Sequence, residues 1–188
     1  MRSVRFATGN QRKIEEASSV LAQYGIVINP VSLSIDEIQH TNPIKITEHK
    51  VKAAYEALGC PLVVNDSSWE IPALSGFPGG YMKDIAQWLT AEDFLRLMDG
   101  RQDRRIILHD VVAYYDGNSV ELFAYDQTGV IIEAPRGNGL SMNQVVVMNN
   151  GNDLTIAEEF AQRSQGASIN PEAYQHWQSF ARWFVECC

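Results

Sequence analysis

The first third of the chain alternates extended runs with helical repeats. Val4–Ala7 has the pattern of a short strand and Thr8–Asn10 that of a turn, after which apolar residues recur at helical spacing. A second strand, Ile26–Val31, precedes a second helix that begins near Pro43 and ends before Gly59. This order predicts a sheet with helices packed on it, and it places Thr8–Asn10 at the entrance of a helix.

The remaining segments continue the same architecture. Pro61–Val64 reads as a buried strand that ends in the polar stretch Asn65–Ser68, and the glycine-rich Ser75–Gly80 reads as a loop. Two extended runs around the Asp-Gly-Asn turn at residues 116–118 predict a hairpin. Further strands are expected at Val130–Glu133 and Val145–Met148, and further helices at about 154–165 and from Pro171 onward. The expected fold class is α/β (mixed α+β), and the 188 residues predict a single domain or two closely packed lobes.

Charge, apolar content and cysteine spacing narrow the partners and the location. The 15 Lys and Arg residues against 23 Asp and Glu residues leave a net charge of -8, which argues against a nucleic acid polymer as partner. No stretch approaches the ~18 apolar residues of a membrane span, and the N-terminus lacks the apolar core of a signal peptide. Cys60, Cys187 and Cys188 do not have the spacing of a zinc site. We therefore expect a cytoplasmic protein with no membrane contact.

The residues from Thr8 to Lys13 have the composition of an anion-binding helix start. The Thr8 hydroxyl, the flexible Gly9 and the Asn10 carboxamide present donors where the helix dipole favours an anion, and Lys13 adds a positive charge one turn later. The alternative is plain helix capping with solvated basic side chains. The P-loop pattern GxxxxGK[ST] is absent.

A second polar cluster, Asn65–Ser68, follows the strand at Pro61–Val64. Asp66 is able to bind a divalent metal through one oxygen and to accept a proton from an attacking water, which suits hydrolysis of an anhydride. The alternative is an Asx turn at a strand end. Alone, each cluster favours its structural alternative; the balance changes when the two clusters are read together.

Four stretches carry a resemblance to a known family. They read FATGNQRK at residues 6–13, VVNDSSWEIPALSGFPGGY at 63–81, EAPRG at 133–137 and TIAEE at 155–159. In this order and spacing they resemble the Ham1, or inosine triphosphate pyrophosphatase, family over nearly the whole chain. The resemblance implies Mg²⁺-dependent hydrolysis of non-canonical purine nucleoside triphosphates, such as ITP, XTP and dITP, to the monophosphate and pyrophosphate. It also implies a homodimer, and a long twisted mixed sheet flanked by helices, with two lobes and the nucleotide in a central cleft.

The resemblance also implies roles for individual residues. The implied phosphate-binding residues are Thr8, Gly9, Asn10, Lys13 and Lys50. Asp66 matches the second acid of a carboxylate pair, which implies the roles of metal ligand and general base, and Ser67 follows it as a substrate contact. With Asp66, Lys13 and Lys50 as catalytic residues, cations offset the charge of the triphosphate while a positioned water attacks the α phosphorus.

The sequence departs from the family pattern near the implied metal. The carboxylate pair is Asn65-Asp66 here, so one negative charge is lost. The metal-binding Glu that the family carries on the second helix aligns with Lys45, although Glu48 follows three residues later on nearly the same face. Two alternatives remain: Glu48 substitutes as a metal ligand, or Lys45 contacts phosphate directly.

The segments implied in base recognition also differ from the family. The pattern GFGYDPxF reads GLSMNQVV at residues 139–146, and its Asp becomes Asn143, which both donates and accepts hydrogen bonds, so the preferred base edge should change. The SHR triplet becomes Gln175-His176-Trp177, which keeps the histidine. Trp177 either stacks on a base or packs in the core, and its place on an apolar helix stripe favours the core.

Three functional hypotheses follow. The leading one is a magnesium-dependent nucleoside triphosphate pyrophosphatase whose base pocket has changed. The second is a nucleotide-binding protein of the same fold that has lost turnover, motivated by Lys45, Asn65, Trp177 and Pro171, the last of which aligns with a lysine of the family. The third, a structural or interaction module, leaves the joint presence of Lys13, Lys50 and the phosphate-site residues around them unexplained.

Overall fold

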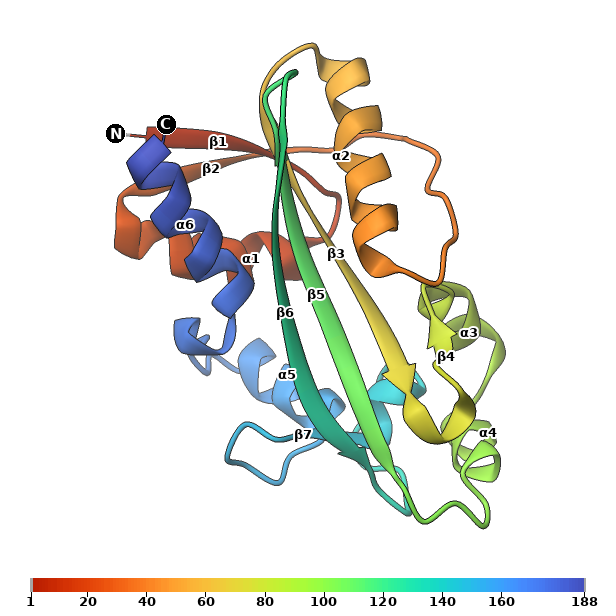
Figure 1. Cartoon of the computed structure of the whole chain (residues 1–188). Coiled ribbons are helices and arrows are strands. Elements are labelled where there is room, and N and C mark those ends of the chain that lie inside the picture. Colours follow the sequence, from red (N-terminus) through yellow and green to blue (C-terminus); the bar gives the residue numbers. More distant parts are fainter. Residues whose placement is uncertain (1, 188) are drawn as a thin grey trace. The chain divides into compact units, whose positions relative to one another are not determined.

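The computed structural model describes residues 2–187 and has the mixed α/β architecture expected from the sequence (Figure 1). Within these residues, seven strands form one sheet in the order β2-β1-β3-β5-β6-β7, and β4 pairs with β3. The described chain forms two compact units. Unit 1 takes residues up to Ser67, Asp110–Tyr125 and from Ile169 onward, and unit 2 takes Ser68–His109 and Asp126–Ser168. Strands β3, β5 and β6 contribute residues to both units.

Unit 1 begins with two parallel strands joined by a helix. Its elements are β1 (Arg2–Ala7), α1 (Gln11–Leu21), β2 (Ile26–Val31), α2 (Pro43–Leu58), the first part of β3 (Leu62–Ile71), the adjoining parts of β5 (Arg105–Tyr115) and β6 (Val120–Ile131), and α6 (Gln175–Cys187). The expected strand-turn-helix start is confirmed. Asn10 caps α1, and α2 begins after the cap Asn42 with proline at its first position and ends at Gly59, whose φ of 65° suits glycine.

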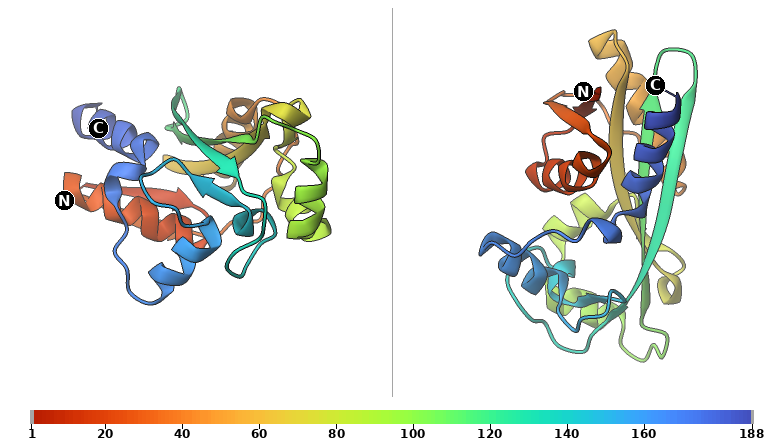
Figure 2. Two further views of the ribbon diagram at one scale, coloured as in Figure 1. Left: turned by 90° about the horizontal axis from the view of Figure 1, so that it is seen from below. Right: turned by 90° about the vertical axis from the view of Figure 1, so that its left-hand side faces the viewer.

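The side chains of unit 1 bury both faces of its strands. On one face, Val63 and Val112 pack with the apolar residues of α1 and α6; on the other, Leu62 and Val64 pack with those of α2. This alternation follows from the two-residue period of a strand. Arg2 at the start of β1 donates to the carbonyl of Val185 near the end of α6 at 3.0 Å, and both views of Figure 2 show the start of the first strand near the end of the last helix.

Unit 2 holds the shorter elements. They are the end of β3, β4 (Phe77–Gly79), α3 (Met82–Trp88), α4 (Ala91–Leu97), β7 (Val146–Met148), α5 (Ile156–Ser164) and the remainder of β5 and β6. Capping boxes at Thr90 and Thr155 begin α4 and α5. Phe94, Ile106 and Met142 are among its fully buried core residues.

The structure corrects three elements expected from the sequence, one of which is the separate strand at Val130–Glu133, whose first two residues instead complete β6. β3 does not end at Val64 but continues to Ile71, so the polar cluster Asn65–Ser68 lies within a strand. The reason is that β5 lies beside β3 and β4 pairs with its final residues, so the backbone hydrogen bonds of the polar segment stay within the sheet. The segment Ser75–Gly80, expected to be a loop, contains the short strand β4. Helices α3 and α4 were not expected.

The hairpin expected around residues 116–118 is confirmed. Asp116 accepts hydrogen bonds from the backbone N–H groups of Asn118 and Ser119 at 2.8 and 2.9 Å, which closes the turn between β5 and β6.

None of the helices in the described part of the chain is long and apolar enough to span a bilayer. Cys60 and Cys187 are free thiols, and Cys188 lies outside the described residues.

Two tryptophans at opposite extremes of burial provide a stability prediction. Trp177 is 1% exposed, whereas Trp88 is 72% exposed. We expect Trp177→Ala to lower the free energy of unfolding by about 3–5 kcal/mol, because it empties a fully buried aromatic site. The control Trp88→Ala should change it by less than ~0.5 kcal/mol. Urea unfolding of both variants measures the difference, and equal losses would contradict the placement of Trp177 in the core.

Candidate functional site

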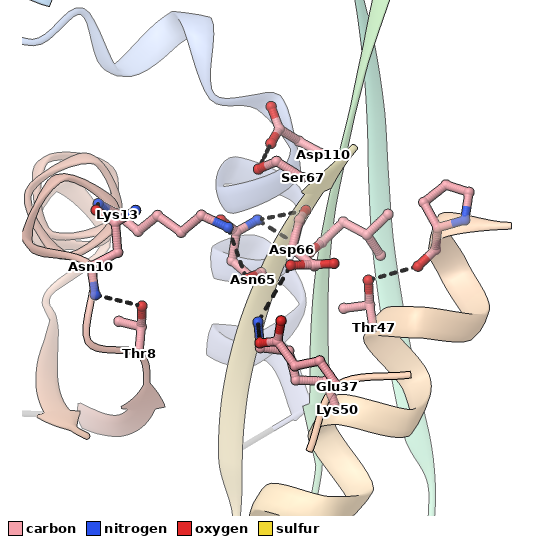
Figure 3. A network of polar contacts seen from close by, with 12 residues as sticks. Thr8, Asn10, Lys13, Glu37, Thr47, Lys50, Asn65, Asp66, Ser67 and Asp110 are labelled. Carbon is pink, nitrogen blue, oxygen red and sulfur yellow. Dashed lines mark hydrogen bonds and ion pairs between the residues drawn. The ribbon is translucent and has the colours of Figure 1, made fainter. Parts of the chain in front are cut away.

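The start of α1 reaches β3 through a lysine. Asn10 caps the helix by accepting from the Arg12 and Lys13 backbone N–H groups, and the Thr8 hydroxyl accepts from the Asn10 N–H at 3.1 Å. The Lys13 ammonium donates to the Asn65 carbonyl at 3.0 Å (Figure 3). The capping interpretation of Asn10 is therefore correct. It does not exclude an anion at the helix start, because Lys13 brings a cation to the strand that carries Asp66.

A second lysine lies between two carboxylates on the α2 side of β3. The Lys50 ammonium lies 2.6 Å from a carboxylate oxygen of Glu37 and 3.3 Å from Oδ1 of Asp66 (Figure 3). Burial alone would lower the pKa of Lys50, but the attraction of Asp66 and Glu37 outweighs it and leaves the pKa above its ordinary value. Lys50 is therefore a firmly charged cation that holds the two acids next to each other.

The strand period separates neighbouring side chains of the polar cluster. Asp66 meets Lys50 of α2, whereas the Ser67 hydroxyl donates to Oδ1 of Asp110 on β5 at 2.6 Å. The buried Asn65, which precedes Asp66 on β3, donates from its amide to the Val111 carbonyl at 3.1 Å. The asparagine at the position of the expected acid therefore links β3 to β5. An ionised carboxylate has no proton to donate and could not form this hydrogen bond.

The base-recognition candidates of α6 lie inside unit 1. Trp177 packs edge-on against Phe6 with ring centroids 5.0 Å apart, so its fully buried ring belongs to the core and core packing, rather than base stacking, accounts for its position. His176 is also buried, and its Nδ1 has no hydrogen-bond partner among the described residues. Burial lowers the pKa of His176, with Asp110 acting against this and Lys13 reinforcing it, so the imidazole is neutral at pH 7.

Other residues expected in the site have different surroundings. Glu48 bonds Lys52 at 2.6 Å, an exposed pair one helical turn apart, and Lys45 is exposed in the first turn of α2. Neither shares a hydrogen bond or ion pair with Asp66 among the described residues. Asn143 belongs to unit 2, in a short 3-10 helix at Met142–Gln144.

Sequence reasoning missed two acids that the structure adds to the cluster. Glu37 lies in the polar connection before α2, where its spacing to Lys50 gives no periodic signal. Asp110 is a carboxylate within a run of apolar strand residues and is only 7% exposed. Burying a charged side chain costs free energy unless it has a hydrogen-bond or ion-pair partner. An acid within an apolar strand was therefore the one sequence signal that pointed to a partner for Asp110.

The lowered pKa of Lys13 predicts how the affinity for a triphosphate depends on pH. Burial is the main cause that lowers its pKa below 10.5, with repulsion from Lys50 and Arg12, and Asp66 and Asp110 oppose the shift. A lysine loses its charge as the pH rises through its pKa, so affinity for a triphosphate should fall at a lower pH than an ordinary lysine would give. Affinity measured against pH tests this. In Lys13→Arg the alkaline loss should disappear, because guanidinium stays charged; superimposed profiles would contradict the assignment.

The α/β fold brings two lysines, two acids and a capped helix start to one strand, an arrangement of charges that is chemically suited to a polyanion and a divalent cation. Comparison with known proteins gives the family. The Ham1 family profile matches residues 4–178, and the chain belongs to that family.

Several relatives match over most of their length. The dITP/XTP pyrophosphatase of Methanopyrus kandleri is 33% identical over 182 residues, 96% of this chain and 95% of the relative. Inosine triphosphate pyrophosphatase 2 of Trypanosoma cruzi is 31% identical over 172 residues, 90% of this chain and 86% of the relative.

Solved structures confirm the fold. A HAM1 protein from Coxiella burnetii superposes with a TM-score of 0.78 at 22% identity, with all of both chains covered. The Staphylococcus aureus Ham1 protein superposes with a TM-score of 0.72 at 21% identity, covering 96% of this chain and 98% of that one.

Proposed function

We propose that the protein is a nucleoside triphosphate pyrophosphatase that hydrolyses non-canonical nucleoside triphosphates to the monophosphate and pyrophosphate. The observation that carries the proposal is the convergence on β3 of Lys13, Lys50 and Asp66, which come from three separate elements. Family membership and the names of the relatives, dITP/XTP and inosine triphosphate pyrophosphatases, support the same activity.

The chain's own residues account for each part of the reaction. Lys13 and the N–H groups at the start of α1 bind the triphosphate, and Lys50 adds a second positive charge. Asp66 accepts a proton from the water that attacks the α phosphorus; the bond from that phosphorus to the bridging oxygen breaks, and pyrophosphate leaves with its electron pair. His176 contacts the nucleoside. For His176, the unpartnered Nδ1 supports this role.

The acids of the cluster fit Mg²⁺. Glu37 and Asp66 face one ammonium, so the two carboxylates lie close together, and one or two carboxylates with phosphate oxygens are a common Mg²⁺ donor set. Among the described residues, no group of three or more His, Cys, Asp or Glu side chains is placed to hold a metal ion. Asp66 and Glu37 would hold the ion, and bound Mg²⁺ would neutralise phosphate charge.

A pair of variants separates the two candidate metal ligands, Glu37 and Glu48. We expect Glu37→Gln to raise the Mg²⁺ concentration for half-maximal activity by about tenfold or more, since a charged ligand becomes neutral. Glu48→Gln should leave it within about twofold, because Glu48 pairs with Lys52. Activity titrated with Mg²⁺ measures both values. The reverse order would assign the ligand to Glu48, one of the two alternatives that the sequence leaves open.

The competing function is nucleotide binding without turnover. It is favoured by Asn65, whose amide is engaged with the Val111 carbonyl where the family pattern carries the first acid of the carboxylate pair. Pyrophosphate release from ITP, XTP, dITP, ATP and GTP, with Mg²⁺ and with EDTA, distinguishes the two functions. The pyrophosphatase releases pyrophosphate from non-canonical compounds only with Mg²⁺. Binding with no release from any compound would favour the alternative.

The homodimer and the cytoplasmic location that the resemblance implies complete the proposal. Light scattering coupled to size-exclusion chromatography tests the dimer directly, and a monomer at micromolar concentration would contradict it.

A further inference from the structure

Asp110 is a nearly buried carboxylate that no part of the proposed reaction uses. It is 7% exposed, and the residues that follow it on β5, Val111 and Val112, are buried and apolar. A carboxylate in such a place is stable only with hydrogen-bond partners. The Ser67 hydroxyl provides one at 2.6 Å, the short separation typical of a charge-assisted hydrogen bond (Figure 3).

This hydrogen bond fixes what Ser67 can offer a ligand. A serine hydroxyl has one proton and two lone pairs, and the proton is committed to Asp110. The remaining lone pairs can only accept. Phosphate oxygens are acceptors too, so Ser67 bonded in this way does not bind the triphosphate; it binds an O–H or N–H donor.

Asp66 and Asp110 have different hydrogen-bond and ion-pair partners. Asp66 forms an ion pair with Lys50 on the α2 side, whereas Asp110 bonds Ser67 and acts electrostatically on His176 of α6 as well as on Lys13 of α1. A buried carboxylate repels phosphate and attracts a donor. The Ser67–Asp110 pair is therefore suited to the uncharged end of a nucleotide.

We propose that Ser67 and Asp110 form a nucleoside subsite, in which Ser67 accepts a hydrogen bond from a sugar O–H or a base N–H and Asp110 is the positioning residue that orients its hydroxyl. The inference rests on the proposed function, because it assumes a nucleotide ligand. It makes Asp110 a residue that selects nucleotides over a bare polyphosphate.

Two probes test the subsite by calorimetry. They are α,β-methylene ITP, which cannot be cleaved at the α–β position, and inorganic tripolyphosphate, which has no nucleoside. We expect Asp110→Ala to weaken binding of the nucleotide analogue by about tenfold or more. Tripolyphosphate should bind unchanged or more tightly, since a negative charge has been removed. The shape-conserving Asp110→Asn gives a second reading if the alanine variant is unstable, and Asp103→Asn, in an exposed ion pair with Arg105, is the matched control.

A double-mutant cycle and a dideoxy probe complete the test. Asp110→Ala and Ser67→Ala should cost about as much together as either alone, because they remove one interaction. If a 2′,3′-dideoxy analogue is insensitive to Asp110→Ala, the donor is a sugar hydroxyl; if it stays sensitive, the donor is a base N–H. Equal weakening of both original probes, or no change in either, would overturn the subsite. A wild-type protein that binds neither probe and releases no pyrophosphate would instead overturn the proposed function, and the subsite with it.

Discussion

Asp66→Asn is expected to lower kcat for pyrophosphate release by about 10²–10⁴-fold, the usual contribution of a general base. The amide keeps the size of the side chain and its place on β3 but has no basic oxygen to take a proton from water. It also removes one of the two negative charges beside Lys50. Steady-state rates on ITP at saturating Mg²⁺ measure the effect.

The interpretation of the Asp66 variant depends on an intact fold. Asp103→Asn is the matched control, because Asp103 is an acid in an exposed ion pair with Arg105, in unit 2. Its rate should equal that of the wild type, and thermal unfolding of both variants should remain cooperative. A folded Asp66→Asn protein with more than about a tenth of wild-type kcat would exclude Asp66 as the base.

Lys13→Met is expected to lower kcat/KM by about 10²–10³-fold, the cost of removing one preorganised donor to developing charge. Lys13 is half-buried and its ammonium is bonded to the Asn65 carbonyl, so its charge is little screened by solvent. Methionine keeps the length and apolar stem of the side chain, which confines the change to the charge.

The matched control for this lysine is Lys52→Met on α2. Lys52 is exposed and bonded to Glu48, so the variant should keep kcat/KM within about twofold. Kinetics on ITP for both variants provide the comparison. A loss of the same size in the two variants would mean that net charge, rather than the position of Lys13, governs the rate.

The sequence predicted local structure well where a pattern had a physical cause within a few residues. The helix start at Asn10 and the Asp116 turn were predictable because each closes through its own backbone neighbours. The end of β3 was not. Asn65–Ser68 have the residue types of a turn, but β5 and β4, which follow later in the chain, keep the segment extended.

The candidate site shows the same limit. Lys13, Lys50 and Asp66 were predictable from motifs whose spacing the chain preserves. Glu37 was not, because its partnership with Lys50 depends on the path of an irregular connection. Long-range pairs of this kind, such as Asp110 with Ser67, leave no periodic trace in the sequence. The burial of Trp177, in contrast, was predictable, because the apolar stripe of its helix favoured the core over base stacking.

Product analysis in ¹⁸O-labelled water tests the central claim most directly. ITP, XTP and dITP are incubated with the wild-type protein and Mg²⁺, and the products are resolved by ³¹P NMR and mass spectrometry. The proposal predicts equimolar monophosphate and pyrophosphate, with the label in the monophosphate, because water attacks the α phosphorus. Label in pyrophosphate, release of a nucleoside diphosphate, or no product from any of the three compounds would contradict it.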